Sequence, residues 1–386
     1  MQRSESRILT THAGSLPRTP ELTALLVRRS RREPVESAEL ERAIRDSTRR
    51  VVARQLAAGV DVGNDGEQAR ESFFTYVQHR MSGFGGTSAR PIMRDITHFP
   101  TYLALRLPDF SRTQVSLMAA PRAVGEVRYV DRAALERECV LFQEVVGEEH
   151  ARFVEPFMTA PSPGIIAAAM TNAHYPRLED YVHALAAALR TEYEHIVAEG
   201  FVLQIDCPDL AMERHTAFAD RPLGEFLAFM ELVVGAINAA LVQVPRERVR
   251  LHVCWGNYNG PHVFDVPLEE IVARLYAARV GALVLSMANP RHAHEHRVLA
   301  RHPLPAGMLL VAGVIDTTTN YVEHPEVVAD RIEHAAHAIG DPRRVIAGTD
   351  CGFETAAGMA DVAEEVVWEK LRALRAGADL ASRRLL

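Results

Sequence analysis

The sequence predicts a single (β/α)₈ barrel (a TIM barrel), an α/β fold in which eight parallel strands alternate with helices over residues 1–386. Short apolar, β-rich runs alternate with longer helical patterns, which favours a parallel sheet with crossover helices. Eight such units over this length favour a closed barrel rather than an open sheet. The predicted strands are 8–13, 60–63, 153–157, 201–205, 249–254, 282–285, 308–315 and 345–347.

Helical patterns separate these runs, and the clearest are 38–58, 178–199, 223–242, 268–278 and 325–339. Residues 81–131 break the alternation, because they hold Gly83, Gly85, Gly86 and several prolines around one short apolar run, 115–119. Glycine and proline at this density are typical of turns and loops. We predict that 81–131 is an insertion between strands two and three, a β-hairpin with loops that covers the barrel mouth.

Composition excludes several classes of protein. Hydrophobic residues make up 48% and charged residues 24%, which are ordinary globular values, and the formal net charge of −7 predicts no general attraction to nucleic acid or anionic membrane. No apolar stretch approaches the ~20 residues of a membrane helix, and the polar N-terminus lacks the apolar core of a signal peptide. The four cysteines show no disulfide-scaffold spacing, so the cytoplasm is the expected compartment.

The chain has a single lysine, Lys370, and arginine supplies the rest of its 43 basic residues. Pyridoxal phosphate enzymes and Schiff-base aldolases need an active-site lysine, and a phosphate-binding P-loop needs one after a glycine-rich turn. No such turn precedes Lys370, so the sequence argues against these classes.

Polar, ionisable and sulfur side chains follow the predicted strands at one end, strand after strand. The active site of such a barrel forms at the C-terminal ends of its strands. We therefore expect one cavity to collect the residues that follow strands one, two, four, five, six, seven and eight, which include Ser15, Glu67, Asp206, His252, Cys254, Ser286, Asp316, Asp350 and Cys351.

The sharpest local pattern is His252-x-Cys254. Residues i and i+2 of a strand share a face, so both side chains would point into the barrel mouth, and Cys351 follows the eighth strand. One imidazole and two thiolates form a favoured zinc set, and a catalytic zinc often has three protein ligands and an open fourth position. A packed histidine beside a buried cysteine is the alternative interpretation of the pattern.

Five motifs in order resemble the catalytic barrel of cobalamin-independent methionine synthase and its single-barrel relatives, which include epoxide:thiol transferases. They are 10–17 (TTHAGSLP), 65–70 (DGEQAR), 204–206 (QID), 252–254 (HVC) and 350–352 (DCG). The resemblance, which runs from about Ile8 to about Thr355, implies that His252, Cys254 and Cys351 bind Zn²⁺. In that family the zinc binds the thiolate of homocysteine, which attacks a methyl group. By position, Ser15, Glu67 and Asp206 resemble the residues that hold the carboxylate and ammonium of the amino acid.

Elementary chemistry agrees with this assignment. A free thiol has a pKa of about 8.5, so little thiolate exists at neutral pH, whereas coordination to zinc deprotonates it. Glu67 and Asp206 would suit an ammonium group as catalytic or binding residues, with a helix cap or a barrel ion pair as the alternative. Ser15 is open between a substrate contact and a helix N-cap before Pro17.

Two departures from the family pattern concern the fourth ligand and the methyl donor. The family's glutamate at the end of the sixth strand, its fourth zinc ligand, aligns with Ser286, whose neutral hydroxyl is a poor ligand for zinc. Water or one of His12, His292, His294 and Glu295 would fill that position instead. The sequence also shows no counterpart of the large N-terminal barrel that helps bind folate, which leaves the donor open.

Other polar residues at the predicted mouth have two interpretations each. Trp255, Asn257 and Arg291 are candidate substrate contacts, but Asn257 also suits a turn, and Arg291 suits either a bidentate contact to a carboxylate or a salt bridge to Glu295. The histidines at 292, 294 and 296 resemble a metal tract, although the start of a surface helix is favoured. Asp316 and Asp350 would either orient metal ligands or cap helices.

The leading interpretation is a zinc-dependent transferase that moves a methyl or alkyl group to a thiol, with homocysteine as the first-choice acceptor. Addition of a thiol to an epoxide, or the reverse lyase reaction, is the enzymatic alternative. A non-catalytic zinc- or ligand-binding barrel that partners a corrinoid protein is the alternative of another class. The expected partners are a small-molecule thiol and an alkyl donor, and the sequence leaves a homo-oligomer open.

Overall fold

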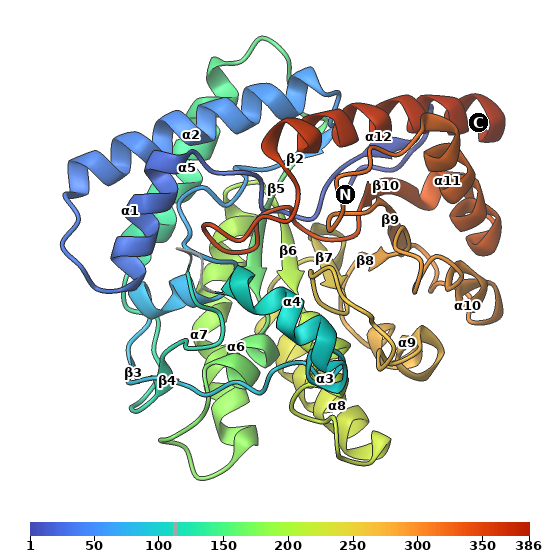
Figure 1. The fold of residues 1–386 in the computed structure, drawn as a ribbon. Helices are drawn as coiled ribbons and strands as arrows, with labels where there is room; N and C mark the ends of the chain where they lie inside the picture. Colours follow the sequence, from blue (N-terminus) through green and yellow to red (C-terminus); the bar gives the residue numbers. More distant parts are fainter. Residues whose placement is uncertain (111–114) are drawn as a thin grey trace.

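Eight parallel strands form the barrel in this computed structural model, which describes residues 1–110 and 115–386. Their order in the sheet is β1-β10-β9-β8-β7-β6-β5-β2, as a barrel wound in sequence order requires (Figure 1). All eight predicted strands are confirmed, and their bounds are β1 Leu9–Thr10, β2 Val62–Gly63, β5 Glu155–Pro161, β6 Val202–Asp206, β7 Val249–Val253, β8 Ala282–Ser286, β9 Leu309–Ile315 and β10 Val345–Thr349.

The barrel closes between its two shortest strands, β1 and β2. A parallel bridge joins Thr11 to Val62, and the amide of Asp61 donates to the carbonyl of Thr10 over 3.1 Å. Side chains reinforce this seam, because the Thr11 hydroxyl donates to the Val62 carbonyl at 2.7 Å and the Thr10 amide donates to the Asp61 carboxylate at 2.9 Å. The seam therefore depends on a few side chains, whereas the strand pairs from β5 to β10 have hydrogen-bonded ladders of four or five residues.

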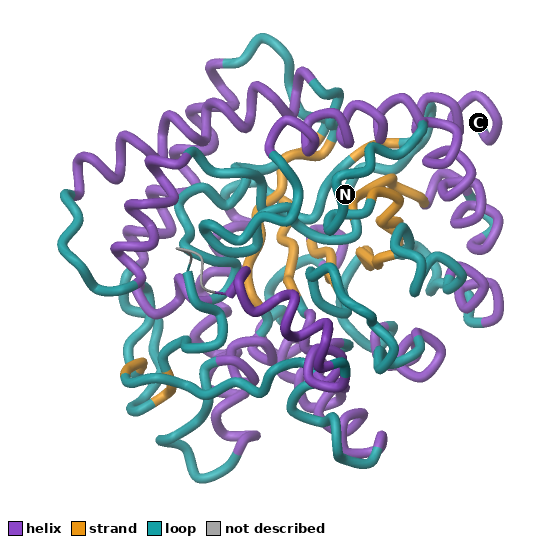
Figure 2. Tube along the Cα trace, viewed as in Figure 1, coloured by secondary structure: helices purple, strands orange, loops and turns teal. Residues whose placement is uncertain are grey.

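Helices surround the strands as an outer layer (Figures 1 and 2). Each of the clearest predicted helical patterns forms a helix close to its expected bounds. The helices outside 81–131 are α1 Pro20–Ser30, α2 Ser37–Ala57, α5 Arg132–Glu148, α6 Pro163–Ala169, α7 Leu178–Ala198, α8 Leu223–Ala240, α9 Leu268–Leu275, α10 His296–Arg301, α11 Pro325–Ile339 and α12 Glu364–Leu385.

One of these helices corrects an expectation from the sequence. By length and composition α8 is apolar enough to cross a membrane, so the statement that no apolar stretch approaches that length was wrong. In the fold α8 packs against α7 and α9, and it buries Phe226, Met230, Val233 and Ile237. Its apolar character is accounted for by this packing in the outer layer of the barrel.

Residues 81–131 lie between β2 and β5, and they differ in detail from the predicted hairpin. The antiparallel strands β3 (Phe84–Gly85) and β4 (Arg122–Ala123) have two residues each, and the helices α3 (Arg94–His98) and α4 (Pro100–Phe110) lie between them. The apolar run 115–119 forms no strand. The helices were missed because the density of proline and glycine suggested loops, whereas Pro100 occupies the first turn of α4, where proline is tolerated.

The insertion lies against the loops at the C-terminal ends of the strands. The Tyr102 hydroxyl donates to the Asn259 carbonyl after β7, and Arg94 donates to the Ala219 carbonyl after β6 over 3.1 Å. Figure 1 shows α3 and α4 crossing this end of the barrel. These contacts agree with the expected cover over the barrel mouth.

Candidate metal centre

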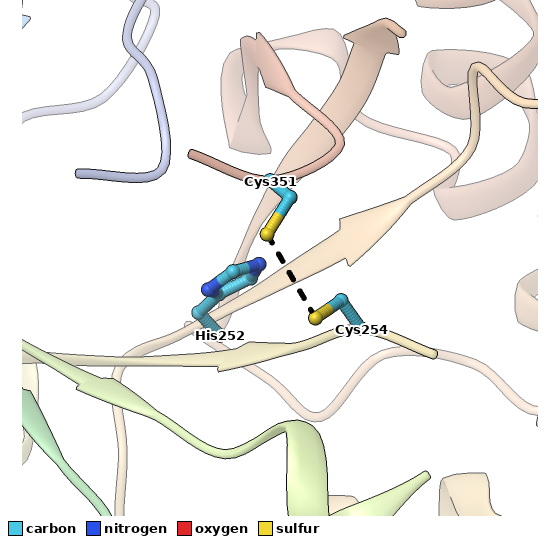
Figure 3. A group of neighbouring side chains, drawn as sticks. All are labelled: His252, Cys254 and Cys351. Carbon is cyan, nitrogen blue, oxygen red and sulfur yellow. Dashed lines mark hydrogen bonds between the residues drawn. The ribbon is translucent and has the colours of Figure 1, made fainter. Parts of the chain in front are cut away.

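His252, Cys254 and Cys351 lie together at this end of the barrel, and all three are buried. His252 belongs to β7, Cys254 follows it, and Cys351 follows β10. One ligand atom of each residue lies within 4.8 Å of the others, and the two sulfur atoms are 4.0 Å apart. In Figure 3 the imidazole and both sulfurs point toward one another. The alternative of an isolated packed histidine beside a buried cysteine does not account for the third side chain.

Asp206 orients the imidazole of His252. The register of β6 against β7 pairs these two residues, and the Asp206 Oδ1 atom lies 2.8 Å from His252 Nδ1. The Gln204 amide donates to the same carboxylate oxygen at 2.7 Å, which fixes its position. A proton on Nδ1 leaves Nε2 as the donor atom for a metal, which is the usual carboxylate–histidine arrangement beside a metal ion.

A hydrogen bond between Cys254 and Cys351 shifts the pKa values of the two thiols in opposite directions. A hydrogen bond from Cys351 is the main reason that the pKa of Cys254 falls well below its usual value, and His252 adds to this effect. The same contact, together with burial, raises the pKa of Cys351. Burial alone would lower the pKa of His252, but hydrogen bonds with Asp206 and Cys254 raise it to about 10.

These three side chains fit a tetrahedral zinc ion. With Zn–S bonds of about 2.3 Å and tetrahedral angles, two thiolates lie roughly 3.8 Å apart. The observed separation of 4.0 Å needs only a small adjustment. One imidazole and two thiolates are also soft enough to favour zinc over magnesium or calcium.

Glu67 lies on the loop after β2 with an unusual backbone and an unpaired oxygen. Its φ of 58° is left-handed, and its Oε1 accepts from the Thr159 hydroxyl at 2.9 Å. Among the described residues nothing donates to the buried Oε2 atom. Burial and the nearby charge of Asp206 raise the pKa of Glu67 to about 8. In the part of the chain that the structure describes, neither a helix cap nor an ion pair uses this carboxyl, and its Oε2 atom has no partner.

Two glycines permit close contacts on this side of the site. A Cβ on Gly14 would lie 2.4 Å from Glu67 Oε1, and a Cβ on Gly352 would lie 2.1 Å from the Ser15 hydroxyl oxygen. Ser15 does not cap a helix, because α1 begins at Pro20 and Thr19 is its N-cap. The helix-cap interpretation of Ser15 was therefore wrong.

Sequence reasoning assigned no role to Thr159 and Arg70, which support Glu67. The Arg70 guanidinium donates to the Thr159 hydroxyl at 2.9 Å and to the Thr159 carbonyl at 2.7 Å. The hydroxyl then donates to Glu67. Arg70 stands in the quoted 65–70 motif, but a threonine within β5 carries no pattern that reveals this function.

The remaining predicted contacts lie in the loops of the mouth. The Asn257 amide donates to the Gly352 carbonyl at 2.9 Å and accepts from the Thr317 hydroxyl at 2.8 Å, so it ties three loops together. The Trp255 indole donates to the Val266 carbonyl at 2.7 Å. Arg291 is exposed and donates to the His262 carbonyl at 2.9 Å, so the predicted salt bridge to Glu295 does not form.

Residues 8–99 and 127–375 match the model of the family described as "Cobalamin-independent synthase, Catalytic domain". The chain belongs to the cobalamin-independent synthase family. The resemblance inferred from the five motifs is confirmed.

Relatives in this family carry more than one name. A methionine synthase of Saccharolobus solfataricus is 24% identical over 351 residues, which cover 89% of this chain and 88% of that protein. A 2-hydroxypropyl-CoM lyase of Xanthobacter autotrophicus is 23% identical and covers 82% of this chain and 81% of its own. A solved B12-independent methionine synthase from a Shewanella species has a TM-score of 0.73 at 21% identity and covers 98% of both chains, which shows the shared fold.

Ser286, which was expected to stand where the family has a glutamate, is hydrogen-bonded to the backbone. The Ser286 hydroxyl donates to the Asp350 carbonyl at 2.8 Å. Of the residues suggested as a substitute ligand, His12 is occupied, because its Nε2 pairs with Gln55 at 2.8 Å and its Nδ1 accepts from the Gly14 amide. Burial lowers the pKa of His12 to about 4, which keeps it neutral.

The three histidines at 292–296 do not converge on a metal in this family member. His292 is buried between Asp265 and Glu295, His294 is exposed, and His296 begins α10. The carboxylate of Asp350 accepts from three backbone amides, at 287, 288 and 289, and caps no helix, whereas its backbone carbonyl lies 3.3 Å from His252 Nε2. Asp316 likewise holds its own loop, through the amide and hydroxyl of Thr318.

Proposed function

We propose that this protein is a zinc-dependent transferase that moves a methyl or other alkyl group to the sulfur of a homocysteine-like thiol. The observation that carries the proposal is the convergence of His252, Cys254 and Cys351, drawn from two strands almost a hundred residues apart in sequence. Membership in the synthase family supports the same reaction class. The names of relatives such as the Saccharolobus solfataricus methionine synthase point to homocysteine as acceptor.

Zinc bound at this site would lower the pKa of the acceptor thiol, so that its sulfur would be a thiolate at neutral pH. The chain's own residues prepare the site. Asp206 keeps a proton on His252 Nδ1, and Cys254 and Cys351 carry two negative charges when ionised, which offset the charge of a divalent ion. Glu67 and the second oxygen of Asp206 would then be available for the rest of the substrate.

Glu67 and Asp206 suit the ammonium group of an amino acid. Among the described residues nothing donates to the buried Oε2 atom of Glu67, and burial together with the charge of Asp206 raises the pKa of Glu67. A bound ammonium would supply the missing donor and favour the ionised form of Glu67. Ser15, close against Gly352, would donate to the amino acid's carboxylate. Homocysteine carries all three groups that these side chains and the metal ligands would recognise.

Turnover tests this proposal directly. The zinc-loaded protein should transfer an alkyl group to homocysteine from at least one of methyltetrahydrofolate, methylcobalamin or a simple epoxide, and zinc-free protein should not. The products are identified by mass spectrometry. Absence of transfer with all three donors, from protein shown to contain zinc, would contradict the proposal and favour a non-catalytic barrel.

Thiol addition to an epoxide, or its reverse, is a second candidate because Ser286 replaces the family glutamate. Without that carboxylate a zinc with His252 and two thiolates is formally neutral, so the bound thiolate is a weaker nucleophile than in its relatives and suits a reactive donor. Similarity to a 2-hydroxypropyl-CoM lyase, at 23% identity, supports this candidate. Wild-type protein should use an activated donor more efficiently than the folate, and efficient turnover with the folate would reject this candidate.

Ser286→Glu sharpens the same question. A carboxylate at the end of β8 should slow zinc loss from the thiol-free protein several-fold in a chelator assay, because it adds a charged ligand. Equal rates of zinc loss in wild type and variant would show that this position does not reach the metal.

All four cysteines are free, and we propose the cytoplasm, where thiols stay reduced, as the working compartment.

A further inference from the structure

A second cluster of potential ligands lies under the insertion. Asp95 comes from α3, His215 from the short helix Met212–His215 after β6, and Asp265 from the loop after β7. One nitrogen of His215 and one oxygen of each carboxylate lie within 4.8 Å of one another. None of the three belongs to the group around Cys254.

Three polar atoms of this cluster, both ring nitrogens of His215 and Asp265 Oδ1, are buried without a hydrogen-bond partner among the described residues. His215 Nδ1 lies 3.3 Å from Asp95 Oδ2, and His215 Nε2 lies 3.7 Å from Asp265 Oδ1. Yet among the described residues neither ring nitrogen of His215, nor Asp265 Oδ1, makes a hydrogen bond. The His215 side chain is fully buried and that of Asp265 is 2% exposed, so surface water does not satisfy them. Unsatisfied buried polar atoms are costly unless a ligand completes them.

The surroundings orient both carboxylates toward the centre of the cluster. Asp265 Oδ2 lies 2.9 Å from His262 Nδ1 and 2.8 Å from His292 Nε2, which leaves Oδ1 facing His215. Asp95 Oδ1 accepts from the Val263 amide at 3.0 Å, and its Oδ2 lies 3.1 Å from the Tyr258 hydroxyl. Asp265 therefore has one oxygen held by its neighbours while the other faces His215, which is typical of a carboxylate ligand supported by an outer shell. Both oxygens of Asp95 are held, which fixes this carboxylate beside His215.

We propose that Asp95, His215 and Asp265 bind a second divalent transition-metal ion, of the Zn²⁺, Co²⁺ or Mn²⁺ class. Imidazole and carboxylate ligands without sulfur suit these ions, and two carboxylates balance the charge of one divalent cation. The contrast with the first site is chemical, because that site is rich in thiolate. A proton is the rival occupant: a positively charged His215 clamped between the two carboxylates would need no metal.

Such an ion would fasten the insertion to the barrel. Asp95 belongs to 81–131, whereas His215 and Asp265 belong to loops of the barrel itself. Removal of the ion would break one connection between α3 and these loops and would leave the two carboxylates on either side of His215 without a bridging cation. We therefore expect the ion to protect residues 81–131 from proteolysis.

Cobalt titration of the chelator-treated full-length protein tests the proposal. Wild type should bind two equivalents of Co²⁺, and one of them should produce the near-ultraviolet absorption of cobalt–thiolate bonds. Asp95→Asn and His215→Ala should each bind one equivalent and keep the thiolate absorption. Cys254→Ser/Cys351→Ser should bind one equivalent without that absorption. Binding of Co²⁺ at Asp95, His215 and Asp265 does not depend on the transfer reaction. The proposed second metal site and the proposed transferase function can therefore fail independently.

His294→Ala is the matched control, because His294 is exposed and lies outside both clusters. It should bind two equivalents like wild type. Asp95→Asn keeps the side-chain volume and covers the case in which His215→Ala fails to fold. A single equivalent in wild type, unchanged in Asp95→Asn and His215→Ala, would overturn the proposal.

Discussion

The two halves of the candidate site are built differently. In the metal half, His252 lies within the five-residue strand β7, and Cys254 comes directly after it. Cys351 follows the five-residue strand β10. The acid half, with Ser15 and Glu67, stands on loops that follow the two-residue strands β1 and β2. Strand register positions the first half, whereas close backbone packing and a left-handed residue position the second.

This difference separates robustness from adaptability. A side chain on a paired strand is placed by many hydrogen bonds, so a metal site built there tolerates changes elsewhere. A carboxylate on a loop is placed by a few contacts, so its position and protonation respond to what binds. We therefore expect substitutions in the metal half to abolish chemistry, and those in the acid half to change affinity and pH dependence.

The largest effect is expected from Cys254→Ser. Loss of one thiolate should remove the metal and with it several kcal/mol of transition-state stabilisation, so activity should fall by roughly 1000-fold or more. Metal content by mass spectrometry and turnover measure this. Cys139→Ser, at another buried cysteine on α5, should keep the metal in the first site. Retention of full activity by Cys254→Ser would remove the basis of the proposed function.

Asp206→Asn should weaken metal binding by roughly 10- to 100-fold, because the neutral amide no longer fixes and polarises His252. Chelator competition measures the affinity. Asp330→Asn, an exposed carboxylate on α11, serves as the control and should change nothing. An unchanged affinity in Asp206→Asn would show that the hydrogen bond to His252 is not needed to position the imidazole.

Glu67→Gln should lower the affinity for methionine by about 2 kcal/mol, roughly 30-fold, through loss of a charged partner for the ammonium. Methionine is the probe because it has no thiol proton to lose. Its affinity for wild type should rise from pH 6 to pH 8, because the Glu67 carboxyl, with a pKa of about 8, must lose a proton to pair with the cation. Calorimetry should show a flat profile for Glu67→Gln, and an equally steep one would reject this assignment.

The same pKa predicts an opposite trend for the empty protein. The pKa of Glu67 is raised above its unfolded value, so its contribution to stability is complete at acid pH and is lost as pH rises toward 8. Thermal unfolding of ligand-free wild type and Glu67→Gln checks this. The variant should lack the part of the decline that Glu67 causes.

The smallest effect is expected from Gly352→Ala. The new Cβ would lie 2.1 Å from the Ser15 hydroxyl oxygen, so Ser15 must move at a cost of about 1 kcal/mol, and methionine affinity should fall roughly 5-fold. Gly224→Ala on α8, where nothing lies within 4 Å of the new Cβ, is the control and should bind normally. Equal affinities for methionine in both variants would show that Ser15 does not contribute to substrate binding.

The sequence predicted the regular parts of the molecule and missed those that depend on tertiary contacts. Eight strands and the His252–Cys254 pair follow from periodicity, because residues i and i+2 of a strand must share a face. The support of Glu67 by Thr159 could not be predicted, since it joins residues ninety-two positions apart. For Arg291 the sequence predicted either a bidentate contact to a substrate carboxylate or a salt bridge to Glu295, and its observed contact with the His262 carbonyl depends on the path of a loop.

The helices of the insertion and the cluster of Asp95, His215 and Asp265 also could not be predicted from the sequence. Glycine and proline indicated an irregular segment, but the helices α3 and α4 are stabilised by contacts with loops that the sequence does not place nearby. Asp95, His215 and Asp265 carried no common motif, because they come from three separate segments. Only the folded chain brings them together.

The seam between β1 and β2 has a consequence for motion. Backbone pairing there is limited to the Thr11–Val62 bridge and its neighbours, so local opening of the barrel should begin at this joint, and its amides should exchange with solvent before those of β6 to β9. Ser15 and Glu67 stand just beyond the seam, one on each side. An amino acid that spans them would act as a clasp, so the substrate itself would hold the barrel shut while it reacts.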